Sequence, residues 1–201
     1  MAEKPPRFDR DAVERTLAEL IRTLGLDPGS EPELAATPAR AAALYEEIFS
    51  GLRPGSEPDL AIFPAPSSGG RTTDLVVVRD VPFYSLCVHH FVPFFGRGHV
   101  AYLPGRDLMG ISGAARLLEH YARRPQLQER IASQVADHLE LALAPRGVAV
   151  VLEARHLCME MRGIHKPGVV ETRVLRGELA DPRWAAVLPV SGGQRRDPHQ
   201  A

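Results

Sequence analysis

Long apolar runs and a charge excess of either sign are absent from this sequence of 201 residues. No stretch approaches the roughly eighteen consecutive apolar residues that a transmembrane helix needs, so none is expected. The first residues, Met1-Ala-Glu-Lys-Pro-Pro, have no apolar run after their charges and do not resemble a secretory signal. The formal net charge of −1 gives no bulk electrostatic reason to expect nucleic acid or an acidic membrane as a partner. These absences predict a soluble cytoplasmic protein.

Lysine and cysteine are also scarce. Lys4 and Lys166 are the only lysines, so arginine carries nearly all of the positive charge. Arginine suits the recognition of phosphate and carboxylate groups, although codon usage in a GC-rich genome explains the same bias. The two cysteines, Cys87 and Cys158, each lie within a few residues of a histidine. In a reducing cytoplasm two thiols bind metal more often than they form a disulfide.

The stretches Cys87-Val-His89-His90 and His156-Leu-Cys158 therefore predict a metal site. Thiolate and neutral imidazole are ligands that Zn²⁺ prefers, and a catalytic zinc usually has three protein ligands and an open fourth position. Cys87, His90 and Cys158 would supply these three. If the first stretch is extended, its two histidines point to opposite sides, so only one shares the metal with Cys87. Buried thiols, a disulfide and a chance His-His pair remain as alternatives.

The N-terminal part is expected to be helical. Apolar residues at three- and four-residue steps predict a helix over 10–24. Thr37-Pro38 is expected to cap a second helix over 39–49, with the proline at its first position. Residues 52–71 are rich in proline, glycine and serine, which indicates a long connection to the main domain. Residues 1–71 are thus expected to form a helical region and its linker.

The main domain, 72–190, is expected to be α+β. The predicted elements are strands over 73–81 and 94–103, a helix that Ser112 caps, a helix that Pro125 opens, and strands over 148–157 and 169–179. This ββααββ order predicts an antiparallel sheet with two helices on one face. The open edges of such a sheet can pair with other copies of the chain to form a barrel. Residues 191–201 are expected to be a disordered tail.

Three separated motifs resemble those of the GTP cyclohydrolase I family, and the resemblance covers roughly residues 10–180. The motifs are Ser85-Leu-Cys87-Val-His89-His90-Phe-Val-Pro93, Arg124-Pro-Gln-Leu-Gln128-Glu129-Arg130 and His156-Leu-Cys158-Met-Glu-Met-Arg162-Gly163. The resemblance implies the tunnelling fold, in which the sheets of several subunits join into a barrel. It also implies a homodecamer with active sites at subunit interfaces.

The resemblance implies an activity as well. The family hydrolyses the guanine imidazole ring of GTP at C8, releases formate and forms 7,8-dihydroneopterin triphosphate, a step of tetrahydrofolate biosynthesis. By position, Cys87, His90 and Cys158 match the zinc ligands. His89 matches the histidine that protonates N7, and His156 matches the second acid/base near N9 and the ribose oxygen.

The resemblance further implies a set of substrate-binding residues. Glu129 matches the carboxylate that accepts hydrogen bonds from N1–H and the exocyclic amine of guanine. Gln128 is expected in the same pocket. Ser112 stands at the start of the phosphate-binding helix, and Arg116 and Arg162 match phosphate-binding arginines.

The sequence departs from the family pattern at three places. Val88 replaces a usual glutamate, Gly113 replaces the lysine of a Ser-Lys pair, and the last strand lacks the usual serines and threonines. The last two changes affect the expected contacts to the triphosphate. A paralogue acting on another guanine nucleotide, an enzyme that stops at the ring-opened formamidopyrimidine, and a non-catalytic nucleotide- or pterin-binding homologue remain as alternatives.

Overall fold

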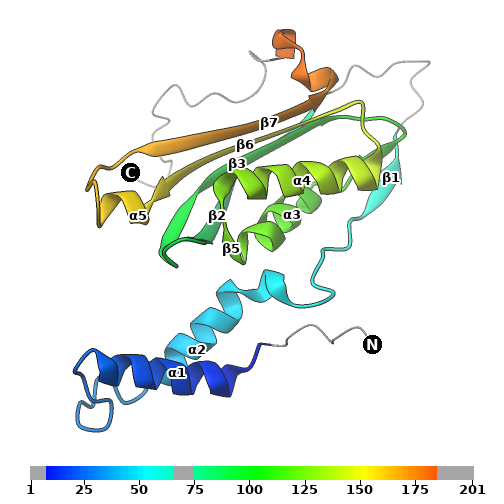
Figure 1. The fold of residues 1–201 in the computed structure, drawn as a ribbon. Coiled ribbons are helices and arrows are strands. Elements are labelled where there is room, and N and C mark those ends of the chain that lie inside the picture. Colours follow the sequence, from blue (N-terminus) through cyan, green and yellow to red (C-terminus); the bar gives the residue numbers. More distant parts are fainter. Residues whose placement is uncertain (1–7, 66–74, 185–201) are drawn as a thin grey trace, which may run out of the picture.

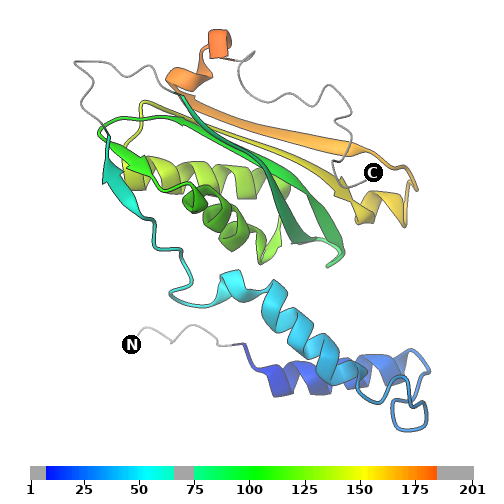
Figure 2. The same ribbon diagram turned by 180° about the vertical axis from the view of Figure 1, so that it is seen from behind.

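A computed structural model describes residues 8–65 and 75–184, and over these ranges the protein is a mixed α+β structure (Figures 1 and 2). A five-stranded sheet carries two long helices on one face, and two further helices precede it in the chain. The predicted α+β architecture, with a helical extension before an antiparallel sheet of the tunnelling type, is confirmed for the single chain. The barrel formed between subunits stays a prediction.

The N-terminal region consists of α1 (Arg10–Thr23), α2 (Thr37–Ile48) and the short 3₁₀ helix η1 (Ser50–Leu52). The carboxylate of Asp9 caps α1 by accepting a hydrogen bond from the Ala12 amide at 2.9 Å. The predicted cap of α2 is wrong by one residue. Ala36 is the N-cap, and the Thr37 hydroxyl donates to the Glu33 carbonyl instead. In both ribbon views α1 and α2 lie away from the sheet, and η1 leads back to it.

The sheet has the strand order β5-β2-β3-β6-β7. Its members are β2 (Val76–Cys87), β3 (Pro93–Leu103), β5 (Pro125–Gln126), β6 (Gly147–His156) and β7 (Val169–Gly177). The four long strands are antiparallel, while β5 runs parallel to β2. A β-bulge lies between Val78 and Val81, and β2 continues past the predicted strand end at residue 81 to Cys87, the start of the first metal-binding stretch. The predicted start of this strand at Thr73 lies outside the described residues.

Two helices, α3 (Ser112–Ala122) and α4 (Gln128–Leu143), cover one face of the sheet. The core lies between them and the strands, where Leu117, Ile131 and Leu139 pack with side chains such as Val150 and Leu152. Two predicted helix starts are wrong. Ser112 lies within α3, whose N-cap is Ile111 and has no side-chain cap. The chain at Pro125 forms β5, because backbone pairing with β2 takes precedence over the helix that proline could open.

The linker region contains an unpredicted strand. β1 (Ile62–Pro64) pairs with β4 (Asp107–Met109) to form a small separate sheet. This pairing lays Leu60 and Met109 over the start of α3, where a Cβ built at Gly113 would lie 2.5 Å from Met109 Sδ. The boundary expected between residues 71 and 72 and the tail at 191–201 lie outside the described residues.

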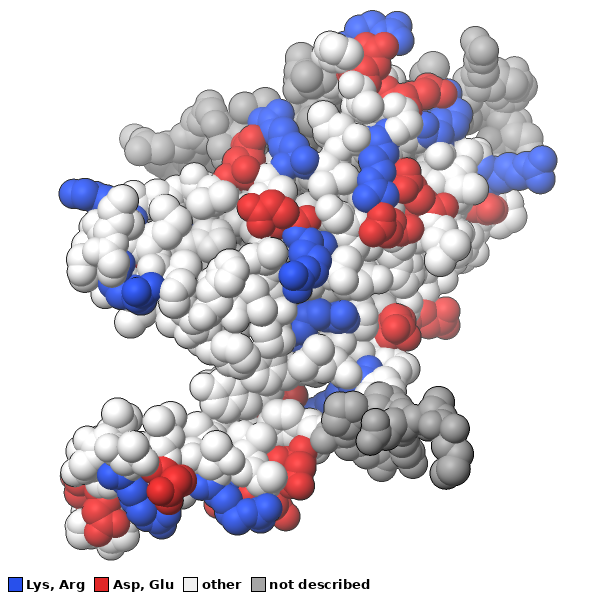
Figure 3. Space-filling model, viewed as in Figure 1, with Lys and Arg blue, Asp and Glu red and all other residues white. Residues whose placement is uncertain are grey.

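The surface carries charges of both signs. Figure 3 shows arginine and acidic side chains interspersed over the face that bears α4, in keeping with the net charge of −1. Ion pairs account for part of this mixing, such as Arg176 with Asp137 and Glu140. Among the described helices, none is both long and apolar enough to cross a membrane.

Candidate active site and metal centre

The first part of the site is the tight turn that follows β2. Cys87 is the last, buried residue of β2, and its carbonyl accepts from the amides of His90 and Phe91 at 3.3 and 2.8 Å. The segment is therefore a turn and not the extended stretch on which the division of the two histidines was argued. Both imidazoles come close to the thiol, with Nδ1 of His89 at 3.8 Å and Nδ1 of His90 at 3.9 Å from Cys87 Sγ.

The second part comes from the end of β6. The short helix α5 (Leu157–Glu160) begins directly after this strand and carries Cys158. Ligand atoms of Cys87, His90 and Cys158 all lie within 4.8 Å of one another. Burial, followed by the nearby Cys87 sulfur, raises the pKa of the Cys158 thiol.

The spacing of these side chains fits a metal ion. Zn–S and Zn–N bonds of about 2.3 and 2.05 Å at a tetrahedral angle separate sulfur and nitrogen by about 3.6 Å. The 3.9 Å between Cys87 Sγ and His90 Nδ1 is close to this value. Two thiols and one imidazole form the kind of donor set that zinc prefers, and three ligands leave a position open. His89 is not part of the three-residue group, although its distance to Cys87 is equally short.

His156 is held beside the metal group at the end of β6. Its ring stacks on the ring of Phe94, with 4.7 Å between centroids and 4° between planes. Its Nε2 lies 2.8 Å from Oε1 of Gln128, the first residue of α4. Burial lowers the pKa of His156, while the carboxylates of Glu129 and Glu160 act in the opposite direction.

The predicted substrate-binding residues occupy two regions. Glu129 is exposed in the first turn of α4, and the charge of its carboxylate acts to raise the pKa of His156. Arg162 follows α5, and its Nη1 lies 2.8 Å from Nε2 of His90, so it belongs to the metal region. Ser112 and Arg116 are exposed on α3. Among the described contacts, none joins Ser112 or Arg116 to the metal group.

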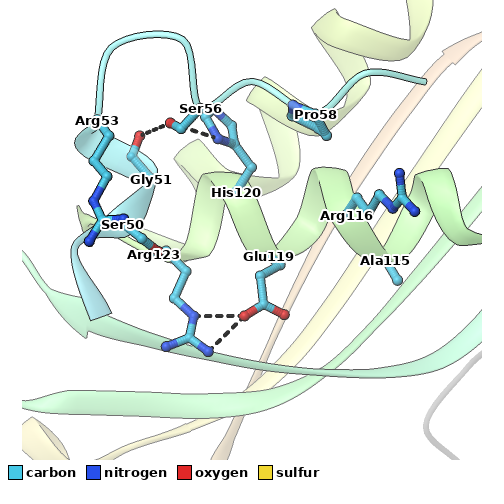
Figure 4. Close-up of a pocket in the computed structure, with 10 residues that line it drawn as sticks. All are labelled: Ser50, Gly51, Arg53, Ser56, Pro58, Ala115, Arg116, Glu119, His120 and Arg123. Atoms are coloured by element: carbon cyan, nitrogen blue, oxygen red, sulfur yellow. Dashed lines mark hydrogen bonds and ion pairs between the residues drawn. The ribbon is translucent and has the colours of Figure 1, made fainter. Parts of the chain in front are cut away.

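Arg116 instead lines a separate cavity of about 500 Å³, here called the η1–α3 pocket (Figure 4). Its walls are residues of η1 and the following loop on one side and residues of α3 on the other: Ser50, Gly51, Arg53, Ser56, Pro58, Ala115, Arg116, Glu119, His120 and Arg123. In Figure 4 Arg53 and Arg116 lie at opposite ends, and Arg123 turns toward Glu119. None of the three candidate metal ligands lines this cavity.

His120 is buried at the junction between the η1 loop and α3, and the sequence analysis did not identify it as a site residue. Its Nε2 lies 2.8 Å from Nη2 of Arg124, and its Nδ1 lies 3.4 Å from the Ser56 hydroxyl. The same Arg124 nitrogen donates to the Gly51 carbonyl at 2.6 Å. Burial, followed by the Arg124 charge, lowers the pKa of His120. No motif marks the contacts with Ser56 and Gly51, because they join segments more than sixty positions apart.

Comparison with known proteins gives a consistent result over most of the chain. A family model described as GTP cyclohydrolase I matches residues 13–187. A protein named GTP cyclohydrolase 1 from Halalkalibacterium halodurans is 46% identical over 177 residues, which cover 87% of this chain and 92% of the relative. Relatives of the same name from Clostridioides difficile and Mycobacterium ulcerans are each 47% identical, over 81% and 86% of this chain and 84% of their own length.

A solved structure of an archaeosine synthase QueF-Like in the apo form also aligns with part of the chain. It covers 53% of this chain and 97% of its own, with 20% sequence identity and a TM-score of 0.45.

Proposed function

The chain belongs to the GTP cyclohydrolase I family, and we propose that it acts as a zinc-dependent enzyme of that type. The activity is hydrolysis of the guanine imidazole ring of GTP at C8, with release of formate and formation of 7,8-dihydroneopterin triphosphate. It serves pterin and tetrahydrofolate biosynthesis, and we place the enzyme in the cytoplasm.

One observation supports the metal-dependent mechanism above the others. Cys87 and Cys158 lie about seventy residues apart in the sequence, yet their thiols and the imidazole of His90 lie within 4.8 Å of one another. A second imidazole, that of His156, is fixed nearby by stacking and by a hydrogen bond. A protein that only bound a nucleotide or pterin would not need this combination of metal ligands and proton-transfer groups.

The proposed mechanism assigns a proton or a contact to each side chain. Cys87, His90 and Cys158 would hold a zinc ion, and bound zinc would lower the pKa of water toward 7 and so supply the nucleophile that the poorly electrophilic C8 requires. His89 protonates N7 during the attack, and His156 exchanges protons near N9 and the ribose oxygen. Both tasks suit imidazole, because its unperturbed pKa lies near the working pH.

Guanine and phosphate contacts complete the proposal. The Glu129 carboxylate accepts hydrogen bonds from N1–H and the exocyclic amine, a donor pattern that adenine lacks. Gln128 borders the same pocket. Ser112, Arg116 and Arg162 bind the phosphates, and exposed arginines suit this because a guanidinium offers a planar fork of donors to phosphate oxygens.

We further propose that the working form is a homo-oligomer, and that it is a decamer. Arg116 lines the η1–α3 pocket and not the metal site of its own chain, which supports an active site to which a second copy contributes Arg116. Open sheet edges provide a means of association. In the described sheet, β7 pairs with β6 alone, and β5 covers β2 only at Leu86 and Cys87. Residues 1–71 and 72–190 would act as helical region and catalytic domain of each subunit.

The decisive experiment is incubation of the zinc-loaded protein with GTP. Formate release, a product with the mass of dihydroneopterin triphosphate, and pterin fluorescence after oxidation are expected together. A formamidopyrimidine product without formate and without pterin would instead identify an enzyme that stops after ring opening. Cys158→Ser should lose both zinc and activity, and a variant that kept stoichiometric zinc would overturn the ligand assignment.

A further inference from the structure

We propose that Gln128 is a positioning residue that fixes the tautomer of His156, so that His156 offers its Nδ1 atom to the substrate. This inference rests on the proposed function, in which His156 transfers protons. It gives Gln128 a role other than the guanine contact expected from the family resemblance. It also names the imidazole nitrogen that does the chemistry.

The orientation of the Gln128 amide is determined by its surroundings. The side chain is only 2% exposed. Its nitrogen donates to two backbone carbonyls, Leu152 of β6 and Val170 of β7, each at 2.9 Å. An amide nitrogen has two hydrogens, and both are used here. Rotating the amide by 180° would bring its oxygen against two carbonyl oxygens, so this rotation is excluded.

The fixed amide determines which ring nitrogen of His156 carries the hydrogen. Because the Gln128 nitrogen faces the carbonyls, its Oε1 is the atom that lies 2.8 Å from His156 Nε2. An amide oxygen only accepts hydrogen bonds, so Nε2 must carry the hydrogen. A neutral imidazole has a single N–H, which leaves Nδ1 of His156 with a free lone pair.

Further contacts keep the ring in this position. Phe94 covers one face of the imidazole with nearly parallel planes. Phe94 and His156 are also cross-strand partners of β3 and β6, so both side chains project from the same face of the sheet. Gln128 thus joins α4, β6 and β7 to the ring, and the position of Nδ1 depends on the register of those elements.

This arrangement suits a group that must both accept and donate a proton. When Nδ1 takes up a proton, the Nε2–H to Gln128 bond remains, so the ring need not turn between the two steps. A guanine contact by Gln128 is disfavoured, because both of its N–H groups are already engaged. Its oxygen retains one lone pair but is buried.

Neutron diffraction from crystals of the perdeuterated, zinc-loaded enzyme tests the assignment directly. At alkaline pH, where His156 is neutral, a deuteron is expected on Nε2 facing Gln128 and none on Nδ1. A deuteron on Nδ1 with a bare Nε2 would overturn the inference. The proposed function fails separately, since its failure would appear as wild-type enzyme that does not consume GTP.

Kinetics of Gln128→Met supply a second test. Methionine has a similar length but cannot accept the Nε2–H bond, so kcat should fall about 10- to 100-fold, the size of effect known for hydrogen-bond partners that orient metal-ligating histidines. KM for GTP and the zinc content should stay unchanged.

Gln134→Met is the matched control. Gln134 lies on the same helix and accepts a hydrogen bond from Gln126, not from His156, so its kcat should equal that of the wild type. An increase in KM with unchanged kcat in Gln128→Met would show that Gln128 contacts guanine and would contradict the proposal. If Gln128→Met does not fold or loses zinc, the neutron experiment on the wild type still decides.

Discussion

The ring of Phe49 meets the ring of Phe91 edge to face, with 6.0 Å between centroids and 76° between planes. Phe49 is the C-cap of α2, and its ring stacks on that of Tyr45 with 5.6 Å between centroids. Phe91 follows the candidate ligand His90 and has a positive φ of 53°, which is unusual for a bulky residue. The N-terminal helical region therefore supports the turn that carries the metal ligands.

We predict that Phe49→Ala weakens zinc binding while the three ligands stay intact. An edge-to-face aromatic pair contributes about 0.5–1.5 kcal/mol, which corresponds to about a 2- to 10-fold lower zinc affinity. Competition with a chromogenic chelator measures the change. Leu44→Ala is the control, because Leu44 is an exposed apolar residue of the same helix. Equal zinc affinities for Phe49→Ala and the wild type would contradict the supporting role.

The sequence was sufficient for the elements that repeat a regular pattern. The apolar stripes of 10–24 and of the helix after Pro125, and the β-branched run of 148–157, correspond to α1, α4 and β6. The three candidate ligands were also predicted, because two cysteines near histidines leave few combinations. Pairing between distant segments was not predictable. β1 with β4 and β5 with β2 depend on partners that a local pattern does not reveal.

In the site, too, short motifs predicted the residues, whereas contacts between distant segments were not predictable. His90 was assigned as a ligand on the assumption of an extended chain, whereas the chain turns at Val88–His90 and brings both histidines to Cys87. The grouping of His90 with the two cysteines agrees with that assignment for a different geometric reason. The contacts of Gln128 with two strands and of His120 with Ser56 could not be inferred, since they depend on tertiary packing.

The adjacent histidines should respond differently to replacement. We predict that His90→Ala loses zinc, whereas His89→Ala keeps zinc and nucleotide binding but loses about 10²–10⁴-fold in ring opening, the usual contribution of general acid catalysis. Metal analysis and formate release measure the two effects. Loss of metal from His89→Ala would exchange the roles of these two residues, a real alternative because both lie almost equally far from Cys87 Sγ.

Glu129 should act on the base and not on the metal. Its side chain is exposed at the start of α4, where the carboxylate is available to a ligand. Glu129→Ala is expected to weaken guanine nucleotide binding by about 10- to 100-fold, because a charge-assisted hydrogen bond contributes about 1.5–3 kcal/mol. Zinc content should not change. Glu140→Ala, an exposed carboxylate on the same helix, is the control, and equal nucleotide affinities for the two variants would return Glu129 to an ordinary surface role.

Acid should destabilise the junction around His120. Burial and Arg124 lower the pKa of His120 in the folded protein, while the unfolded chain keeps a value near 6.5. The His120 imidazole is neutral in both the folded and the unfolded state above that pH. As the pH falls below 6.5, the unfolded state binds a proton first, so the free energy of unfolding decreases until the lowered folded pKa is reached. Urea unfolding of His120→Gln should show a shallower decline of the unfolding free energy as the pH falls below 6.5, by at most about 1.4 kcal/mol per pH unit. An unchanged slope would show that His120 does not contribute.

The last prediction concerns the number of phosphates on the preferred substrate. The start of α3 offers backbone N–H groups to an anion, but Gly113 brings no ammonium group where the family usually has lysine. A charge-assisted contact of that kind is worth about 1.5–3 kcal/mol, or about ten- to a hundredfold in binding. Arg116 and Arg162 compensate only in part, so GTP should be favoured over GDP and GMP less strongly than in relatives that carry the lysine.

Comparison of kcat/KM for GTP, GDP and GMP on the wild type and on Gly113→Lys tests this expectation. A side chain at this position must also displace Met109, because a Cβ at Gly113 would lie 2.5 Å from its sulfur and 3.3 Å from Leu60 Cδ2. Gly113→Ala carries the same steric cost without the charge, so the effect of the lysine is the difference between these two variants. Gly113→Lys should raise the preference for GTP about tenfold or more over Gly113→Ala. If the wild type already prefers GTP by several hundredfold and the lysine adds nothing, the arginines compensate fully and the prediction is wrong.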